Sequence, residues 1–245
     1  MIENILITAG GTAEPIDRVR SITNTGTGKL GSLIAARFSE YEEVKNIWYV
    51  HAKNAVMPEC DKVSSVPISS AEDLLCTVKK LCAENRIDAV IHSMAVSDYR
   101  VRSVISAQEV FAASHESADI DELFRFTDKE NLVKKSNKIS SDMHNPVIFL
   151  EKTPKVLPVF RKLLPEAVIV GFKLLDHVSH EELIDTAHRL LQKNSCDYVL
   201  ANDYQTVEAG AHEGYLIDRF RNETAFSGKE AIAAGIAEAV MKGAI

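Results

Sequence analysis

The chain has 245 residues, of which 46% are apolar and 26% are charged, so it has the composition of a folded globular protein. It contains no run of about 20 apolar residues, which excludes a helix that spans a membrane. The net charge of −7, without a long Lys/Arg run, argues against binding to nucleic acid or to an anionic membrane surface. We therefore expect a soluble protein that holds any anionic ligand with local clusters of basic residues.

The cysteines and histidines give information on the cellular compartment but do not indicate a metal site. The four cysteines are far apart and form no CxxC pair, and the N-terminus lacks the apolar segment of a signal peptide. These features predict a protein of the reducing cytoplasm. The eight histidines include no HExxH motif, which favours solvated side chains over a zinc site.

Short apolar segments alternate with amphipathic helical patterns along the chain. The predicted strands are residues 2–8, 44–51, 88–93, 146–150, 167–172 and 197–201. Helices are predicted over residues 30–41, 74–82 and 183–191, and Ser70 and Ser179 precede the last two as start signals. Because this alternation is typical of parallel sheets, the predicted fold is α/β, with a doubly wound, mostly parallel, Rossmann-like sheet.

Two segments interrupt the alternation. Residues 8–27 form a long loop between the first strand and the first helix, and residues 100–145 are polar and of mixed charge. Loops of this length are more often functional than idle, although a poorly ordered insertion is an alternative for the second. We predict a single domain over residues 1–245, with residues 100–145 inserted in it as a mobile flap.

A glycine-rich segment precedes the first helix. Gly26, Gly28 and Gly31 spell the GxGxxG pattern of dinucleotide-binding folds, which makes an NAD(P)-dependent oxidoreductase an alternative function. That pattern normally follows a strand directly, and the next strand normally ends in an acidic residue; neither holds here. Residues 25–29 still bring backbone amides, two hydroxyls and a helix N-terminus together, which suits a phosphate. A glycine-rich helix start without a ligand is the alternative.

Three further places carry candidate ligand-binding side chains. Asp98 follows the strand at 88–93, where parallel sheets bind ligands, and could accept from ribose hydroxyls or cap the next segment. Phe172, where the strand at 167–172 is expected to lead into a loop, could stack on a base. Arg189 and Lys193 share one face of a predicted helix and could meet a triphosphate, with ordinary solvated charges as the alternative.

Taken in order, several segments resemble the phosphopantothenate-cysteine ligase family, also called phosphopantothenoylcysteine synthetase. The likeness is to the bacterial stand-alone form, without a flavin decarboxylase domain. The segments are TAGGT at 8–12, EPID at 14–17, TNTGTGKLG at 23–31, AVSDY at 95–99, KISS at 138–141, KTP at 152–154, VGF at 170–172 and AND at 201–203. The resemblance implies a ligase of coenzyme A biosynthesis that uses CTP, or ATP, to activate 4'-phosphopantothenate as an acyl nucleotide (acyl-CMP). Cysteine then displaces the nucleotide.

The resemblance also implies roles for individual residues. Arg20 and Asn24 would handle the substrate and the acyl phosphate, and Lys138 of the flap, or Lys134 or Lys135, would neutralise charge at the α-phosphate. The nucleotide-binding residues would be Gly10, Gly11, Gly26, Thr27, Gly28, Lys29, Met94, Ala95, Asp98, Gly171, Phe172, Arg189 and Lys193. Mg²⁺ with unknown ligands, no flavin, and a homodimer are expected. A nucleotide-binding subunit without catalysis is the remaining alternative.

Overall fold

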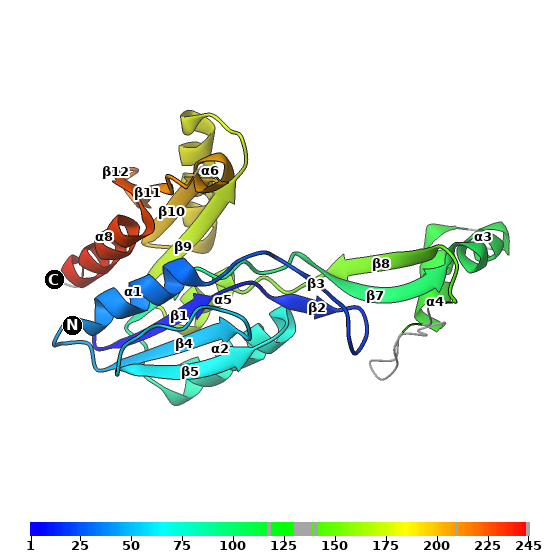
Figure 1. Ribbon diagram of the computed structural model, residues 1–245, viewed down its shortest axis with the longest axis horizontal. Helices are drawn as coiled ribbons and strands as arrows, with labels where there is room; N and C mark the ends of the chain where they lie inside the picture. The colour runs from blue at the N-terminus through cyan, green and yellow to red at the C-terminus, as the bar shows by residue number, and fades with distance from the viewer. Residues whose placement is uncertain (117–118, 130–138, 140–141, 209, 244–245) are drawn as a thin grey trace.

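The computed structural model describes residues 1–116, 119–129, 139, 142–208 and 210–243. Its centre is an eight-stranded sheet with helices on both faces (Figure 1). The strand order is β12 (Glu223–Ser227), β11 (Glu213–Asp218), β10 (Tyr198–Asp203), β9 (Val168–Leu175), β6 (Ala89–His92), β1 (Asn4–Ala9), β4 (Asn46–Ala52) and β5 (Val63–Ile68). All neighbours from β10 to β5 are parallel, and β11 is antiparallel to both of its neighbours. The predicted doubly wound, mostly parallel α/β fold is confirmed.

The helices bury apolar side chains against both faces of this sheet. One face carries α1 (Lys29–Ser39) and α8 (Lys229–Lys242), and the other carries α2 (Ala71–Glu84), α5 (Leu157–Leu163) and α6 (His180–Asn194). Along β1, Ile5 and Ile7 pack with α1 and α8, whereas Leu6 packs with the opposite helices. Because both faces are covered, the consecutive residues 5–7 of β1 are all apolar and buried, as the sequence predicted.

Serine side chains begin two of the helices. Ser70 Oγ accepts from the Asp73 backbone N–H at 3.2 Å and starts α2, and Ser179 Oγ accepts from the Glu182 N–H at 3.2 Å and starts α6. Both positions agree with the predicted start signals. Helices α1 and α8 differ, because their N-cap residues are glycines without a side-chain cap.

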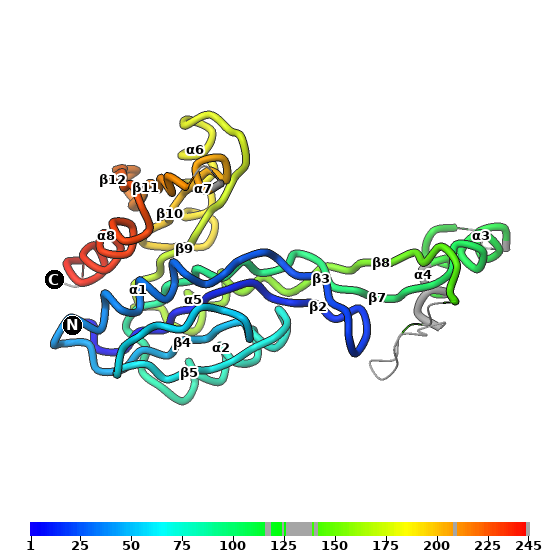
Figure 2. The backbone as a smooth tube through the Cα atoms, viewed as in Figure 1, coloured from blue at the N-terminus to red at the C-terminus, as the bar shows by residue number. Residues whose placement is uncertain are grey.

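An arm extends away from the sheet (Figures 1 and 2). It consists of the antiparallel strands β7 (Tyr99–Ser106) and β8 (Pro146–Lys152), with α3 (Ala107–Glu116) and α4 (Ile120–Lys129) following β7. The prediction that residues 146–150 belong to the central sheet is therefore wrong. Alternate residues of β8 are exposed, as in a two-stranded ribbon, although its apolar sequence resembles that of a buried strand. Of the predicted flap, residues 130–138 and 140–141 lie outside the described residues.

The loop between β1 and α1 contains a short hairpin, formed by β2 (Ala13–Pro15) and β3 (Ser21–Thr23). Asp17 holds its turn, because Oδ1 accepts from the N–H groups of Val19 at 2.9 Å and Arg20 at 2.8 Å. A final short helix, α7 (Tyr204–Glu208), follows β10. Among the described residues, every helix is too short or too polar to span a bilayer.

Strand β9 is longer than predicted. The sequence suggests a strand that ends at Phe172 and leads into a loop, but β9 continues to Leu175 and pairs with β10 as far as Asp203. The expectation of a loop at Lys173 is wrong, because the parallel partner strand extends the hydrogen-bond ladder past the apolar segment. Phe172 therefore lies within the sheet.

Candidate functional site

A cavity of about 840 Å³ lies at the carboxyl ends of the parallel strands. We call it the glycine-loop cavity, because residues 23–31 form one part of its wall. Gly10, Ser93 and Ala95 contribute from the ends of β1 and β6, and Asn202, Lys229 and other residues contribute from the C-terminal part of the chain. In open parallel sheets this edge is where ligands bind.

Glycines allow the loop to pack closely on the strand ends. Gly28 has a φ of +73°, and a Cβ there would lie 2.8 Å from the Cβ of Ala55. A Cβ on Gly11 would lie 2.4 Å from the carbonyl oxygen of Asn24, so Gly11 supports the loop from behind. Larger residues at these positions would push the loop away from the sheet.

Asn24 joins the loop to the segment after β6. Its Nδ2 donates to the carbonyl oxygen of Ala95 at 3.2 Å, and the Ala95 N–H donates to the Gly10 carbonyl at 2.8 Å. The predicted residues Gly10, Asn24, Gly26, Thr27, Gly28, Lys29 and Ala95 all line the same cavity. The structure thus brings together the loop and two neighbouring strand ends, as expected for parallel strands.

The glycine-loop cavity is basic. Lys29, Lys229 and His212 line it, and none of its described lining residues is acidic. Burial and the charge of Lys229 lower the pKa of His212, while Glu230 acts in the opposite direction. A chain with a net charge of −7 therefore contains a cavity suited to an anion.

A second cavity, of about 320 Å³, lies on the other side of the segment that follows β6. We call it the Asp98 cavity; residues 96–98 and 154–158 line it together with His92 and Lys193. The Asp98 carboxylate forms an ion pair with Lys155. Ala95 lines the first cavity and Val96 the second, so adjacent residues separate the two.

His92 forms part of the wall of the Asp98 cavity and is only 8% exposed. Its Nδ1 lies 2.8 Å from Thr8 Oγ1, and its ring packs edge-on against Phe160. Burial lowers the pKa of His92 from 6.5 to about 4. The imidazole is therefore neutral at pH 7.

Arg20 is held by the hairpin turn. Its Nε and Nη2 donate to Asp17 Oδ2 at 3.0 and 2.6 Å, and this interaction holds the pKa of Asp17 well below its usual range. Arg20 Nη2 also donates to the Ile139 carbonyl at 3.3 Å, while the Ile139 N–H donates to Asp17 at 3.1 Å. Lys138, the residue before Ile139, lies outside the described residues, as do Lys134 and Lys135.

Five of the residues predicted to bind nucleotide line neither cavity, and one of them, Gly11, lies behind the loop. Met94 and Gly171 are buried, and Phe172 packs on the face of the sheet that carries α1 and α8. Arg189 is exposed on α6, where its Nη2 donates to Thr186 Oγ1 at 2.9 Å. Lys193, one turn further along α6, lines the Asp98 cavity instead.

The predicted site residues did not include the C-terminal part of the wall, formed by Asn202, Tyr204, His212 and Lys229, although Asn202 lies in the AND segment of the resemblance. One signal was available for Lys229. A Gly-Lys pair begins α8 at residues 228–229, as another begins α1 at residues 28–29. Only the folded chain brings the two pairs to one cavity.

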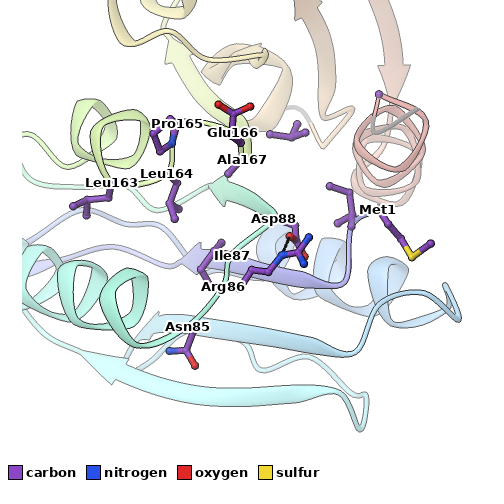
Figure 3. A pocket seen from close by; sticks show the side chains of 13 residues that line it. Met1, Asn85, Arg86, Ile87, Asp88, Leu163, Leu164, Pro165, Glu166 and Ala167 are labelled. Atoms are coloured by element: carbon purple, nitrogen blue, oxygen red, sulfur yellow. Dashed lines mark hydrogen bonds and ion pairs between the residues drawn. The ribbon is translucent and has the colours of Figure 1, made fainter.

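A third cavity, of about 560 Å³, lies at the amino ends of β1, β6 and β9 (Figure 3). Its Asp88 carboxylate accepts from the N–H groups of Glu3 and Asn4, both at 3.0 Å, and from Arg86 Nε at 2.8 Å. These bonds tie β1 to the start of β6. The carboxylate thus has a structural role at the end of the sheet opposite the candidate site.

The described residues contain no cluster of three or more His, Cys, Asp or Glu side chains placed to hold a metal. The described wall of the glycine-loop cavity offers amides and hydroxyls, but no carboxylate for Mg²⁺. These residues do not fit a resident Mg²⁺ site. A divalent ion would have to enter with phosphate and water as its ligands.

Known proteins match the whole length of the chain. Residues 2–116 and 101–244 match the family described as DNA/pantothenate metabolism flavoprotein C-terminal domain. The Coenzyme A biosynthesis bifunctional protein CoaBC of Thermococcus kodakarensis is 28% identical over 89% of this chain and 45% of its own length. The chain spans about half the length of the curated relatives it matches.

Two solved structures share the fold. The crystal structure of the DNA/pantothenate metabolism flavoprotein from Streptococcus pneumoniae has a TM-score of 0.84 and 33% identity, and the match covers 98% of this chain and 99% of that chain. A histidine-to-alanine mutant of Cab2 in complex with phosphopantothenate-cysteine has a TM-score of 0.69 at 16% identity, covering 99% and 88% of the two chains. The second likeness concerns the fold alone.

Proposed function

Because the chain belongs to the DNA/pantothenate metabolism flavoprotein C-terminal domain family, we propose that it is a phosphopantothenate-cysteine ligase of coenzyme A biosynthesis. The names of the curated relatives support this pathway, and a protein of the same fold is described in complex with phosphopantothenate-cysteine. The observation that carries the proposal is the basic glycine-loop cavity at the carboxyl edge of the sheet.

The proposed reaction has two steps. A carboxylate oxygen of 4'-phosphopantothenate attacks the α-phosphorus of CTP, and the bond to the bridging oxygen breaks, so that pyrophosphate leaves with the bonding electrons. The amine of cysteine then attacks the acyl carbon, CMP leaves with its phosphate oxygen, and the nitrogen loses a proton. The first step brings two anions together, so it needs cations and oriented amides.

The glycine-loop cavity would bind the phosphates. The backbone amides of residues 26–29 and the ammonium group of Lys29 would contact the phosphate oxygens, because helix α1 begins there without a side-chain cap. Asn24 would face the reacting carboxylate, since it lies between the loop and Ala95. The chain itself thus supplies positive charge and orientation.

The Asp98 cavity would hold the nucleoside portion. Asp98 would accept from ribose hydroxyls, as the sequence predicted, and Lys155 would remain beside it to offset its charge. The two cavities share the segment after β6, so an acyl nucleotide could extend from one into the other. CTP is the proposed nucleotide, with ATP as the alternative.

Arg20 and Lys138 would act from the neighbouring hairpin and the flap. Asp17 orients the guanidinium of Arg20 through two hydrogen bonds, which would leave the remaining N–H groups to bind substrate. Lys138 would neutralise the charge that grows on the α-phosphate. Mg²⁺ would be carried by the nucleotide.

A homodimer is proposed as the assembled form. Ile148 and Leu150, two residues apart on β8, are 40% and 47% exposed, which gives one face of the arm an apolar patch. Exposed apolar side chains on a ribbon favour burial against a partner. A second copy of the chain would cover this apolar face.

The decisive experiment omits cysteine. Purified protein is incubated with 4'-phosphopantothenate, Mg²⁺ and each nucleoside triphosphate in turn, and mass spectrometry detects pyrophosphate and an acyl nucleotide. Cysteine added afterwards should release the nucleoside monophosphate. If no nucleotide yields either product, the ligase proposal is wrong, and CTP binding without pyrophosphate release would instead favour a non-catalytic subunit.

A further inference from the structure

We infer that Lys229 binds the pyrophosphate portion of the nucleotide. The inference rests on the proposed function of the glycine-loop cavity. Lys229 lies in the sequence beyond residue 203, where the last segment of the family resemblance ends. Lys229 is the first residue of α8, is partly buried, and lines this cavity.

Among the described residues, no acidic side chain pairs with Lys229. It forms no hydrogen bond or ion pair within the described part of the chain, whereas Lys242 on the same helix pairs with Glu238 and Lys155 pairs with Asp98. The sequence contains 35 acidic residues, so this isolation is not caused by a shortage of carboxylates. A lysine that lines a cavity without forming an ion pair is available to bind an anionic ligand there.

The rest of the cavity favours the same ligand. Lys29 also lines the cavity without an ion pair to a described residue. The positive charge of Lys229 contributes to lowering the pKa of His212, which also lines the cavity. No described lining residue is acidic, and Glu230, the nearest acid in sequence to Lys229, is not among them. Two lysines on the wall of one cavity are suited to an anion of more than one charge, such as a polyphosphate.

The fold brings the two lysines together. Helices α1 and α8 pack against each other on one face of the sheet (Figures 1 and 2). The first residue of each, Lys29 and Lys229, lines the cavity. Lys29 belongs to the loop that Asn24 joins to Ala95, whereas Lys229 belongs to the C-terminal part of the wall with Asn202 and His212. We therefore assign the α-phosphate to the loop and the departing phosphates to Lys229.

When the bond between the α-phosphorus and the bridging oxygen breaks, the electron pair stays on pyrophosphate, and its negative charge increases. The Lys229 ammonium would stabilise that charge without transferring a proton. Its loss should weaken binding of the nucleotide more than binding of phosphopantothenate.

The test measures binding of inorganic tripolyphosphate and pyrophosphate by calorimetry. Lys229→Gln should weaken tripolyphosphate binding by about tenfold or more, on the scale of one lost charged hydrogen bond. Lys229→Arg should restore most of the affinity, and Lys242→Gln, which removes a lysine near the far end of the same helix, should leave it unchanged. Circular dichroism and thermal unfolding verify that each variant is folded.

Two results overturn the inference: wild-type protein that binds neither anion, and Lys229→Gln protein that binds them as the wild type does. A ligase assay on the wild type tests the proposed function separately. If anion binding depends on Lys229 but no triphosphate yields an acyl nucleotide, the anion site at Lys229 is supported and the proposed ligase function is wrong. If the wild type is an active ligase and Lys229→Gln leaves the KM for nucleotide unchanged, the role of Lys229 is wrong but the ligase function stands.

Discussion

Lys29 and Lys229 lie near opposite ends of the sequence, yet they begin two packed helices on the wall of one cavity. The arrangement follows from the fold, because α1 and α8 cover the same face of the sheet and both start at its carboxyl edge. It explains how a chain with a net charge of −7 can offer a site to a polyanion. The net charge argues against long nucleic acids but does not exclude a nucleotide.

Gly28 should be required for the shape of the loop. Gly28→Ala places a Cβ 2.8 Å from Ala55 Cβ in a backbone with φ of +73°. We expect a loss of more than about 1 kcal/mol in the free energy of unfolding, measured with urea, and weaker phosphate binding. Gly210→Ala is a matched control, because Gly210 has a φ of +79° but open space around it. Equal losses in both variants would contradict the role of close packing.

His92 should make the fold sensitive to acid. Its pKa in the fold is about 4, below the ordinary value of 6.5, so the unfolded chain takes up a proton first as the pH falls. Stability is therefore complete above about pH 6.5 and declines toward pH 4, by at most about 1.4 kcal/mol per pH unit.

The measurement is urea unfolding at pH 7 and pH 5. His92→Asn should reduce the loss of stability between these two pH values, because the buried titrating group is gone. His115→Asn replaces an exposed histidine on α3 and should retain the wild-type pH dependence. A pH dependence that His92→Asn leaves unchanged would show that other groups cause the acid sensitivity.

Lys138 is expected to act in the first chemical step. Lys138→Gln should lower turnover by about 10²-fold or more with little change in thermal stability, on the scale of losing one preorganised donor. Lys45→Gln, which removes a surface lysine paired with Glu3 at the amino end of the sheet, serves as the control. Unchanged turnover would remove Lys138 from the mechanism, and Lys134 and Lys135 would be tested next.

The apolar face of the arm should support dimerisation. Replacing both Ile148 and Leu150 with glutamate places charges on the exposed face of β8. The sedimentation coefficient should therefore fall from the value of a dimer toward that of a monomer. Phe220→Glu changes an apolar side chain that is 77% exposed outside the arm and should leave the assembly unchanged. A wild-type protein that sediments as a monomer would contradict the proposed homodimer.

Much of the fold could be predicted because it depends on local patterns. The apolar strands β1, β4 and β6 and the serine-capped helices α2 and α6 are recognisable from residue types alone. Strands β5 and β12 were missed because most of their residues are partly exposed, so they lack a continuous apolar segment. Strand β8 was assigned to the wrong sheet because pairing partners are a long-range property.

The sequence by itself determined the alternation of strands and helices, the glycine loop with its lysine, and the resemblance that family membership confirmed. Only the tertiary structure decided which charges share a cavity. It brought Lys229 and His212 to the glycine loop, and it separated Asp98 and Lys193 into an adjoining cavity. The physical reason is that sheet register and crossover connections determine which face and edge each residue occupies, and these depend on partners distant in the chain.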